Sequence, residues 1–124
     1  MTLALWCILA AALLPTIFVG LAKSQMKLLH NSAPREFTAS LEGWRKRARW
    51  AEQNSYESFP PFAAAVLVAH ITEADPQTAN ILAITYIVAR ILYGAFYISD
   101  NGYLRTLSWA LGVCSIIGLF IISA

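Results

Sequence analysis

An arginine and two phenols recur at helical spacing in the third apolar stretch of the sequence. Arg90, Tyr93 and Tyr97 follow one another at steps of three and four residues, which places all three on one face of an α-helix. A charged side chain that faced lipid would cost at least about 2.5 kcal/mol, so we expect Arg90 to turn inward and find a partner. A guanidinium beside hydroxyl groups can bind a small anionic ligand.

Further polar residues stand at comparable depth in the two neighbouring apolar stretches. Asn54 and Glu57 precede the apolar run that starts at Phe59, and Arg105 opens the last one. We expect these groups to meet in one layer, in the cytoplasmic half of the membrane. Amide, carboxylate, guanidinium and phenol groups on converging faces indicate a pocket for a small zwitterionic or anionic ligand. The candidate site is Asn54, Glu57, Arg90, Tyr93, Tyr97 and Arg105.

A simpler interpretation exists for two of these residues. Glu57 and Arg90 can neutralise each other as an ion pair that holds two helices together inside the membrane. Such a pair does not account for a second arginine, two phenols and an amide at the same depth. Both interpretations remain open at the level of the sequence.

Composition shows that membrane helices must position these side chains. Hydrophobic residues make up 58% and charged residues 13% of the 124 residues, whereas soluble domains average roughly 45–50% and 25%. A bilayer core about 30 Å thick needs roughly 20 helical residues. We therefore expect an all-α fold, an integral membrane four-helix bundle that forms a single domain over residues 1–124. The expected spans are about 3–22, 54–72, 78–98 and 104–123, with a loop at about 23–53.

Loop charges indicate how the bundle is oriented. The loop 23–53 is rich in lysine and arginine, whereas the next connection holds only Glu73 and Asp75. By the positive-inside rule the basic loop is cytoplasmic, so both termini are periplasmic and the site faces the cytoplasm of a bacterial inner membrane. Residues 44–50 mix basic and aromatic side chains beside a span, which favours contact with membrane lipids over nucleic acid.

Two prolines follow the polar part of the second span. Inside a helix, Pro60 and Pro61 would free the carbonyl groups of Tyr56 and Glu57 and produce a kink beside the pocket. Alternatively the pair marks the start of a helix, and Glu57 then belongs to a loop.

Three motifs in chain order resemble the signatures of successive helices in the MAPEG family, the membrane-associated proteins of eicosanoid and glutathione metabolism. The resemblance extends from about residue 44 to the end of the chain and is closer to the bacterial type. The motifs are Asn54-x-x-Glu57-x-x-Pro60 followed by Phe62, then Arg90-x-x-Tyr93-x-x-x-Tyr97, then Leu104-Arg105 with Gly112.

The resemblance implies a four-helix protomer in a homotrimer that binds glutathione between neighbouring subunits. Its implied activity is a glutathione transferase or peroxidase that acts on lipophilic electrophiles or lipid hydroperoxides. Carried over by motif, Arg105 would stabilise the thiolate as the catalytic residue. The residues that would hold the tripeptide are Asn54, Glu57, Arg90, Tyr93 and Tyr97.

The sequence also departs from the family pattern. The family has an arginine four residues before the asparagine, and this chain has Trp50 there. The interval from Tyr97 to Arg105 is eight residues, which resembles bacterial relatives more than eukaryotic enzymes. These departures leave an alternative: a non-catalytic structural or accessory subunit of a larger membrane complex.

The chemistry of glutathione suits these residue types. A thiol with a pKa of about 8.5 is only about 3% ionised at pH 7. A nearby guanidinium that lowered this pKa by about two, worth roughly 2.7 kcal/mol, would make the thiolate dominant. No metal is needed, and His30 and His70 lie too far apart in the sequence to suggest a metal site.

Overall fold

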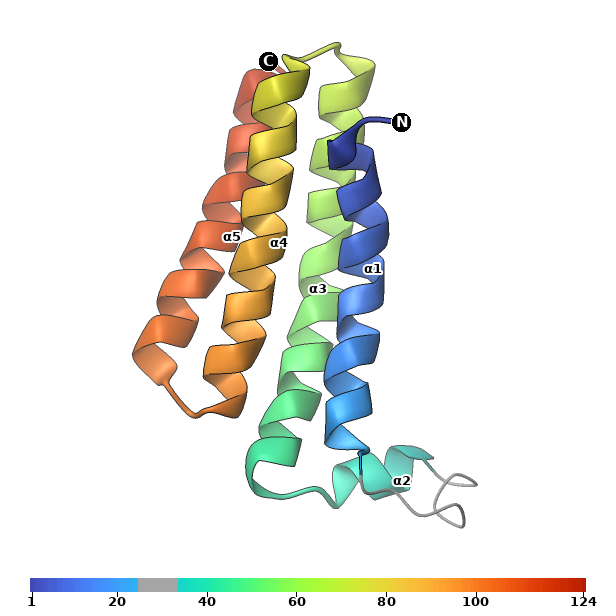
Figure 1. Ribbon diagram of the computed structural model, residues 1–124, viewed down its shortest axis with the longest axis vertical. Coiled ribbons are helices and arrows are strands. Elements are labelled where there is room, and N and C mark those ends of the chain that lie inside the picture. The colour runs from blue at the N-terminus through green and yellow to red at the C-terminus, as the bar shows by residue number, and fades with distance from the viewer. Residues whose placement is uncertain (25–33) are drawn as a thin grey trace.

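The computed structural model describes residues 1–24 and 34–124, which form a bundle of four long helices and one short helix (Figure 1). The helices α1 and α3 lie side by side, and α4 and α5 form an antiparallel hairpin against them. Both termini lie at the same end of the bundle (Figure 1). The helices are α1 (Leu3–Ala22), α2 (Pro34–Ala39), α3 (Gly43–Ile71), α4 (Pro76–Ile98) and α5 (Gly102–Ile122).

Three helices, α1, α4 and α5, are long and apolar enough to cross a membrane. The first matches its expected bounds, and α4 and α5 each begin two residues earlier than expected. Side chains cap the beginning of all three: Thr2 accepts from the backbone of Leu5, Asp75 from Thr78 and Asn101 from Leu104. The expectation of an all-α membrane bundle is confirmed.

The helix α3 extends well beyond the expected span of about 54–72, because it begins at Gly43, in the second half of the expected loop. Gly43 has a φ of +61°, a conformation that glycine adopts without strain. The first turns of α3 are held by packing, since Ala48 and Ala51 are fully buried. The second half of the expected loop is therefore largely helical. The helix also runs through both prolines, so the interpretation in which they open a helix is wrong.

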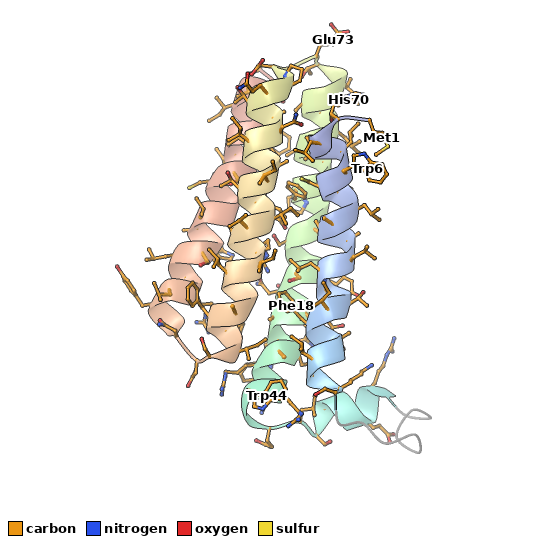
Figure 2. The ribbon with its side chains drawn as sticks, in the orientation of Figure 1. Met1, Trp6, Phe18, Trp44, His70 and Glu73 are labelled. Carbon is orange, nitrogen blue, oxygen red and sulfur yellow. The ribbon has the colours of Figure 1, made fainter. Side chains whose placement is uncertain are left out.

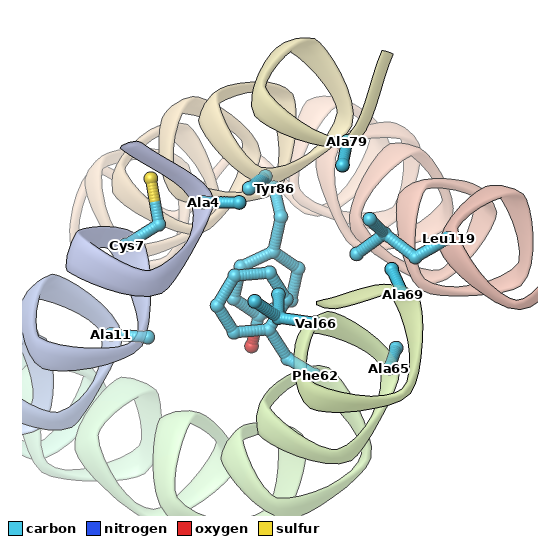
Figure 3. Packing of buried hydrophobic residues seen from close by; sticks show 11 residues of the cluster. Ala4, Cys7, Ala11, Phe62, Ala65, Val66, Ala69, Ala79, Tyr86 and Leu119 are labelled. Carbon is cyan, nitrogen blue, oxygen red and sulfur yellow. The ribbon is translucent and has the colours of Figure 1, made fainter. Parts of the chain in front are cut away.

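The core at the end nearest the termini is almost wholly apolar (Figure 3). At its centre the rings of Phe62 and Tyr86 stack in parallel, with centroids 3.8 Å apart. Alanines from α1, α3 and α4 surround them and allow close helix contact.

Two smaller buried clusters lie toward the other end of the bundle. Phe18 packs with Ala51 and Tyr93, and beyond them Ala22 packs with Ala48 and the partly buried Ile98. The second cluster joins the last residues of α1 and α4 to the early part of α3. It therefore lies level with the ends of two apolar helices. Polar side chains of the candidate site lie at this level and slightly nearer the middle of the bundle.

Candidate functional site

Arg90 is almost completely buried between α3 and α4, with 2% of its surface exposed. Its Nη2 atom donates to Asn54 Oδ1 at 2.8 Å and to Ser55 Oγ at 3.3 Å. Its guanidinium carbon lies 4.2 Å from the centroid of the Tyr93 ring, a favourable cation–π distance. Its Nε atom is buried without a hydrogen-bond partner among the described residues.

The partners of Arg90 correct one interpretation of the sequence. Glu57 forms no ion pair with Arg90, and the neighbouring acidic residue of α3, Glu52, pairs with Arg49 instead. Arg90 is thus a buried cation surrounded by an amide, a hydroxyl and an aromatic ring, without a carboxylate to balance its charge. Burying an ion in this way is costly unless an anionic group can approach it.

A cavity of ≈ 300 Å³ opens between α3 and α4, next to residues that contact Arg90. Two of its walls are residues bonded to or stacked on that guanidinium, Asn54 and Tyr93. Glu57 is exposed in the same lining. The full lining is Trp50, Gln53, Asn54, Glu57, Tyr93 and Tyr97.

Arg105 reaches the same region through an aromatic side chain. Its guanidinium carbon lies 4.6 Å from the centroid of the Tyr97 ring. The Tyr97 ring in turn meets Tyr93 edge to face at 5.5 Å. The two arginines thus stack on neighbouring tyrosines, although Arg105 does not line the cavity.

All six residues expected from the sequence therefore occur in one neighbourhood. Four line the cavity, Arg90 contacts two of these four, and Arg105 contacts Tyr97. Tyr86 shares their helical face but belongs to the core, because its hydroxyl forms a hydrogen bond of 2.6 Å with Ser58. On this face of α4, Tyr86 thus belongs to the apolar core, whereas Tyr93 and Tyr97 belong to the site.

Sequence reasoning missed two polar residues of the site, Gln53 in the lining and Ser55 beside Arg90. Gln53 stands four residues before Glu57, a spacing that places both on one helical face. Ser55 carried no comparable signal, because a serine inside a helix usually bonds to its own backbone. Ser55 does donate to the carbonyl of Ala51, and it also accepts from Arg90.

Trp50 forms an aromatic wall where the family pattern has an arginine. Its ring centroid lies 6.1 Å from that of Tyr97, and the ammonium of Lys46 lies 5.3 Å from its ring centroid. The cation beside this ring is therefore Lys46, which stands one turn earlier on α3.

Arg47 binds the end of α4 that carries Tyr93 and Tyr97. Its Nε and Nη2 atoms donate to the carbonyl oxygen of Ile98 at 3.1 and 3.0 Å. Ile98 is the last residue of α4 and follows Tyr97 directly. The forked guanidinium therefore satisfies a carbonyl that the helix end leaves open and holds Tyr97 in place.

A second, larger cavity of ≈ 640 Å³ adjoins the first and shares Gln53 and Glu57 with it. It extends toward the end of α1, where Lys23 contributes to its lining. Within the described part of the chain no three histidine, cysteine, aspartate or glutamate side chains are placed to hold a metal ion. His30 lies outside the described residues.

Comparison with known proteins bears on this arrangement. No curated protein matches the chain. The model of the MAPEG family, however, matches residues 3–124, a range that contains all four long helices and every residue of the candidate site. The match extends the resemblance of three short motifs to nearly the whole sequence, including α1. The chain therefore belongs to the MAPEG family, whose members are helical membrane proteins.

Proposed function

We propose that this protein is a membrane-bound glutathione-dependent transferase or peroxidase. It would stabilise the thiolate of glutathione for attack on lipophilic electrophiles or lipid hydroperoxides. The observation that carries the proposal is Arg90, a buried guanidinium without a balancing carboxylate beside an open cavity. Membership of the family supports glutathione as the anion that this site accepts.

The hydrogen bond between Arg90 and Asn54 determines what Asn54 can offer to a ligand. A guanidinium only donates, so the amide oxygen of Asn54 must face it, as the 2.8 Å bond shows. The NH₂ group of Asn54 is then available to donate to an acceptor in the cavity. Together with the hydroxyls of Tyr93 and Tyr97, it would hold the carboxylate and peptide oxygens of the tripeptide.

The remaining charges of glutathione have partners of the right sign. Its ammonium group would bind Glu57, which is exposed in the lining. Its thiol would lie toward Arg105, whose charge favours the thiolate over the neutral thiol. Arginine suits this role because it keeps its charge in a poorly hydrated setting.

The proposal includes four membrane crossings and three subunits. We take α3 as the fourth crossing, with the basic segment between α1 and α3 in the cytoplasm of a bacterial cell and both termini in the periplasm. A neighbouring subunit of a homotrimer would close the cavity over the tripeptide. A lipophilic second substrate would then reach the thiolate from the bilayer.

The test is a titration of the purified protein with glutathione at several pH values, followed by the ultraviolet absorbance of the thiolate. We expect a signal at pH 7 that Arg105→Ala removes and Arg105→Lys partly keeps, because the lysine retains the charge. Binding measured by calorimetry in the same samples separates loss of the thiolate from loss of affinity. Wild-type protein that binds no glutathione would overturn the proposal.

Trp50 favours a second candidate, a non-catalytic structural or accessory subunit. Its ring packs near Tyr97, where the family pattern has a guanidinium. On this alternative, wild-type protein would bind no glutathione and would purify in fixed ratio with unrelated membrane subunits. Binding gained by Trp50→Arg would show that the aromatic wall alone had blocked the site.

A further inference from the structure

A hollow of ≈ 190 Å³ lies between α2 and α3, beside the candidate site. Three of its lining side chains are cations and none is a carboxylate. The uncharged members include an indole and a primary amide, which can both donate hydrogen bonds. The lining is Arg35, Ala39, Lys46, Arg49, Trp50 and Gln53.

The positive charges come from separate elements and are held in place. Arg35 belongs to α2, whereas Lys46 and Arg49 are three residues apart on α3 and share a face. The buried Glu52 pairs with Arg49, and the Trp50 ring holds the ammonium of Lys46 at 5.3 Å from its centroid. Cations gathered around one hollow repel each other, and an anion placed among them relieves this repulsion.

The hollow lies level with the ends of two apolar helices, where we expect the lipid headgroups. Ala48 packs with Ala22 and Ile98, which are the last residues of α1 and α4. Lys46 stands two residues before Ala48 and Arg49 directly follows it, so both lie where two apolar helices end. Trp44 and Trp50 are 37% and 42% exposed at this level, and such rings are typical of the membrane–water interface. Figure 2 shows Trp44 at the end of the bundle opposite Met1, His70 and Glu73.

We propose that this hollow binds the phosphate group of an anionic phospholipid. Arg35, Lys46 and Arg49 would surround the phosphate oxygens, and the Trp50 ring would cover the glycerol backbone. Because Trp50 and Gln53 also line the candidate site, the bound lipid would form part of its outer wall. This inference rests on the charges and their depth, and it does not depend on the use of glutathione.

The test uses the detergent-purified protein and native mass spectrometry. Phosphatidylglycerol and phosphatidylcholine with identical acyl chains are offered in equal amounts. Basic side chains at this depth attract anionic headgroups, so we expect the wild-type protein to retain phosphatidylglycerol with a preference of roughly tenfold or more. The double variant Arg35→Gln with Lys46→Gln should lose most of this preference, because the remaining cation, Arg49, is paired with Glu52.

The matched control is Arg45→Gln, which removes a cation from the same helix but outside the hollow. The Arg45 guanidinium lies over the Trp44 ring, 4.4 Å from its centroid, so this variant should keep most of the preference. Thermal unfolding of each variant shows that the fold is intact. Equal retention of both lipids by the wild-type protein would overturn the proposal, as would a preference that survives in the double variant.

Soluble competitors identify the source of the phosphate. Inorganic phosphate at millimolar concentration should leave the bound phosphatidylglycerol in place, and its displacement would show that the hollow takes a free anion instead. Displacement by glutathione would assign the hollow to the neighbouring site and would likewise overturn the proposal.

Discussion

At the scale of single residues, Arg90 is the most informative position. Its guanidinium has only neutral partners, an amide, a hydroxyl and an aromatic face, and one of its nitrogen atoms has no partner among the described residues. A buried ion without a counter-charge carries a desolvation cost that an apolar side chain of similar size avoids. An arginine in such surroundings is explained better by ligand binding than by the stability of the bundle.

This argument predicts opposite effects of two substitutions on α4. Arg90→Met should leave the unfolding temperature unchanged or raise it, while the affinity for glutathione falls at least tenfold, about 1.4 kcal/mol. Tyr86→Phe removes the hydroxyl bonded to Ser58 and should cost about 1 kcal/mol of stability without changing affinity. Calorimetry and thermal unfolding in detergent measure both quantities. An Arg90→Met protein that fails to fold would show that the role of Arg90 is structural.

At the scale of elements, α4 carries three residues of the site and contacts α1, α3 and α5. It contacts α1 at Gly94, where an added Cβ atom would lie 2.1 Å from Cζ of Phe18. Gly112 of α5 faces Arg90 with more room, since a Cβ atom there would be 3.7 Å from Arg90 Cδ. An alanine side chain therefore fits at Gly112, whereas at Gly94 it would collide with Phe18.

We expect Gly94→Ala to destabilise the protein by about 1–3 kcal/mol, because the buried Phe18 ring must move. Gly112→Ala is the control and should be neutral or slightly stabilising, since alanine favours a helix over glycine by about 1 kcal/mol. Thermal unfolding in one detergent compares the two. Combining Gly94→Ala with Phe18→Leu should recover part of the loss, and no recovery would argue against the contact.

Arg47 links α3 to the end of α4, and its removal should affect both stability and the site. We expect Arg47→Met to cost about 1.5 kcal/mol, because two charge-assisted hydrogen bonds to the Ile98 carbonyl are lost. The thiolate signal should weaken in the same variant, since Tyr97 precedes Ile98. Arg45→Met serves as the control. An equal loss of stability in this variant would mean that the loss in Arg47→Met comes from the removed positive charge and not from the hydrogen bonds to Ile98.

At the scale of the whole molecule, the question is which helices cross the membrane. The helices α1, α4 and α5 are apolar enough to do so, and α3 combines a polar first half with an apolar second half. The bundle places α3 beside α1 along its length (Figure 1). If α3 crosses too, the segment before α3 lies on the opposite side of the membrane from the turn before α4.

Single cysteines introduced at exposed positions test this topology, with Cys7 and Cys114 replaced by alanine. Glu73→Cys should react with a membrane-impermeant maleimide on intact cells. Glu42→Cys and Ser99→Cys should react only after the cells are opened, because they lie at the other end of the bundle. Labelling of Glu42→Cys and Glu73→Cys from the same side would mean that α3 does not cross.

The sequence alone determined which side chains share a helical face and where the apolar helices lie. Arg90, Tyr93 and Tyr97 follow the period of an α-helix, so their common face is a local property. The bounds of α1, α4 and α5 follow to within two residues from predominantly apolar runs. The family motifs also lie within single helices and could be recognised without knowing how the helices pack.

Only the tertiary structure decided which faces meet. The choice of Asn54 and Ser55 rather than Glu57 as partners of Arg90 depends on how α3 is rotated against α4, and contacts such as Phe62 against Tyr86 set that rotation. The start of α3 at Gly43 depends on the burial of Ala48 and Ala51 against other helices. These outcomes are not encoded in any one segment, because packing energy arises between segments distant in the chain.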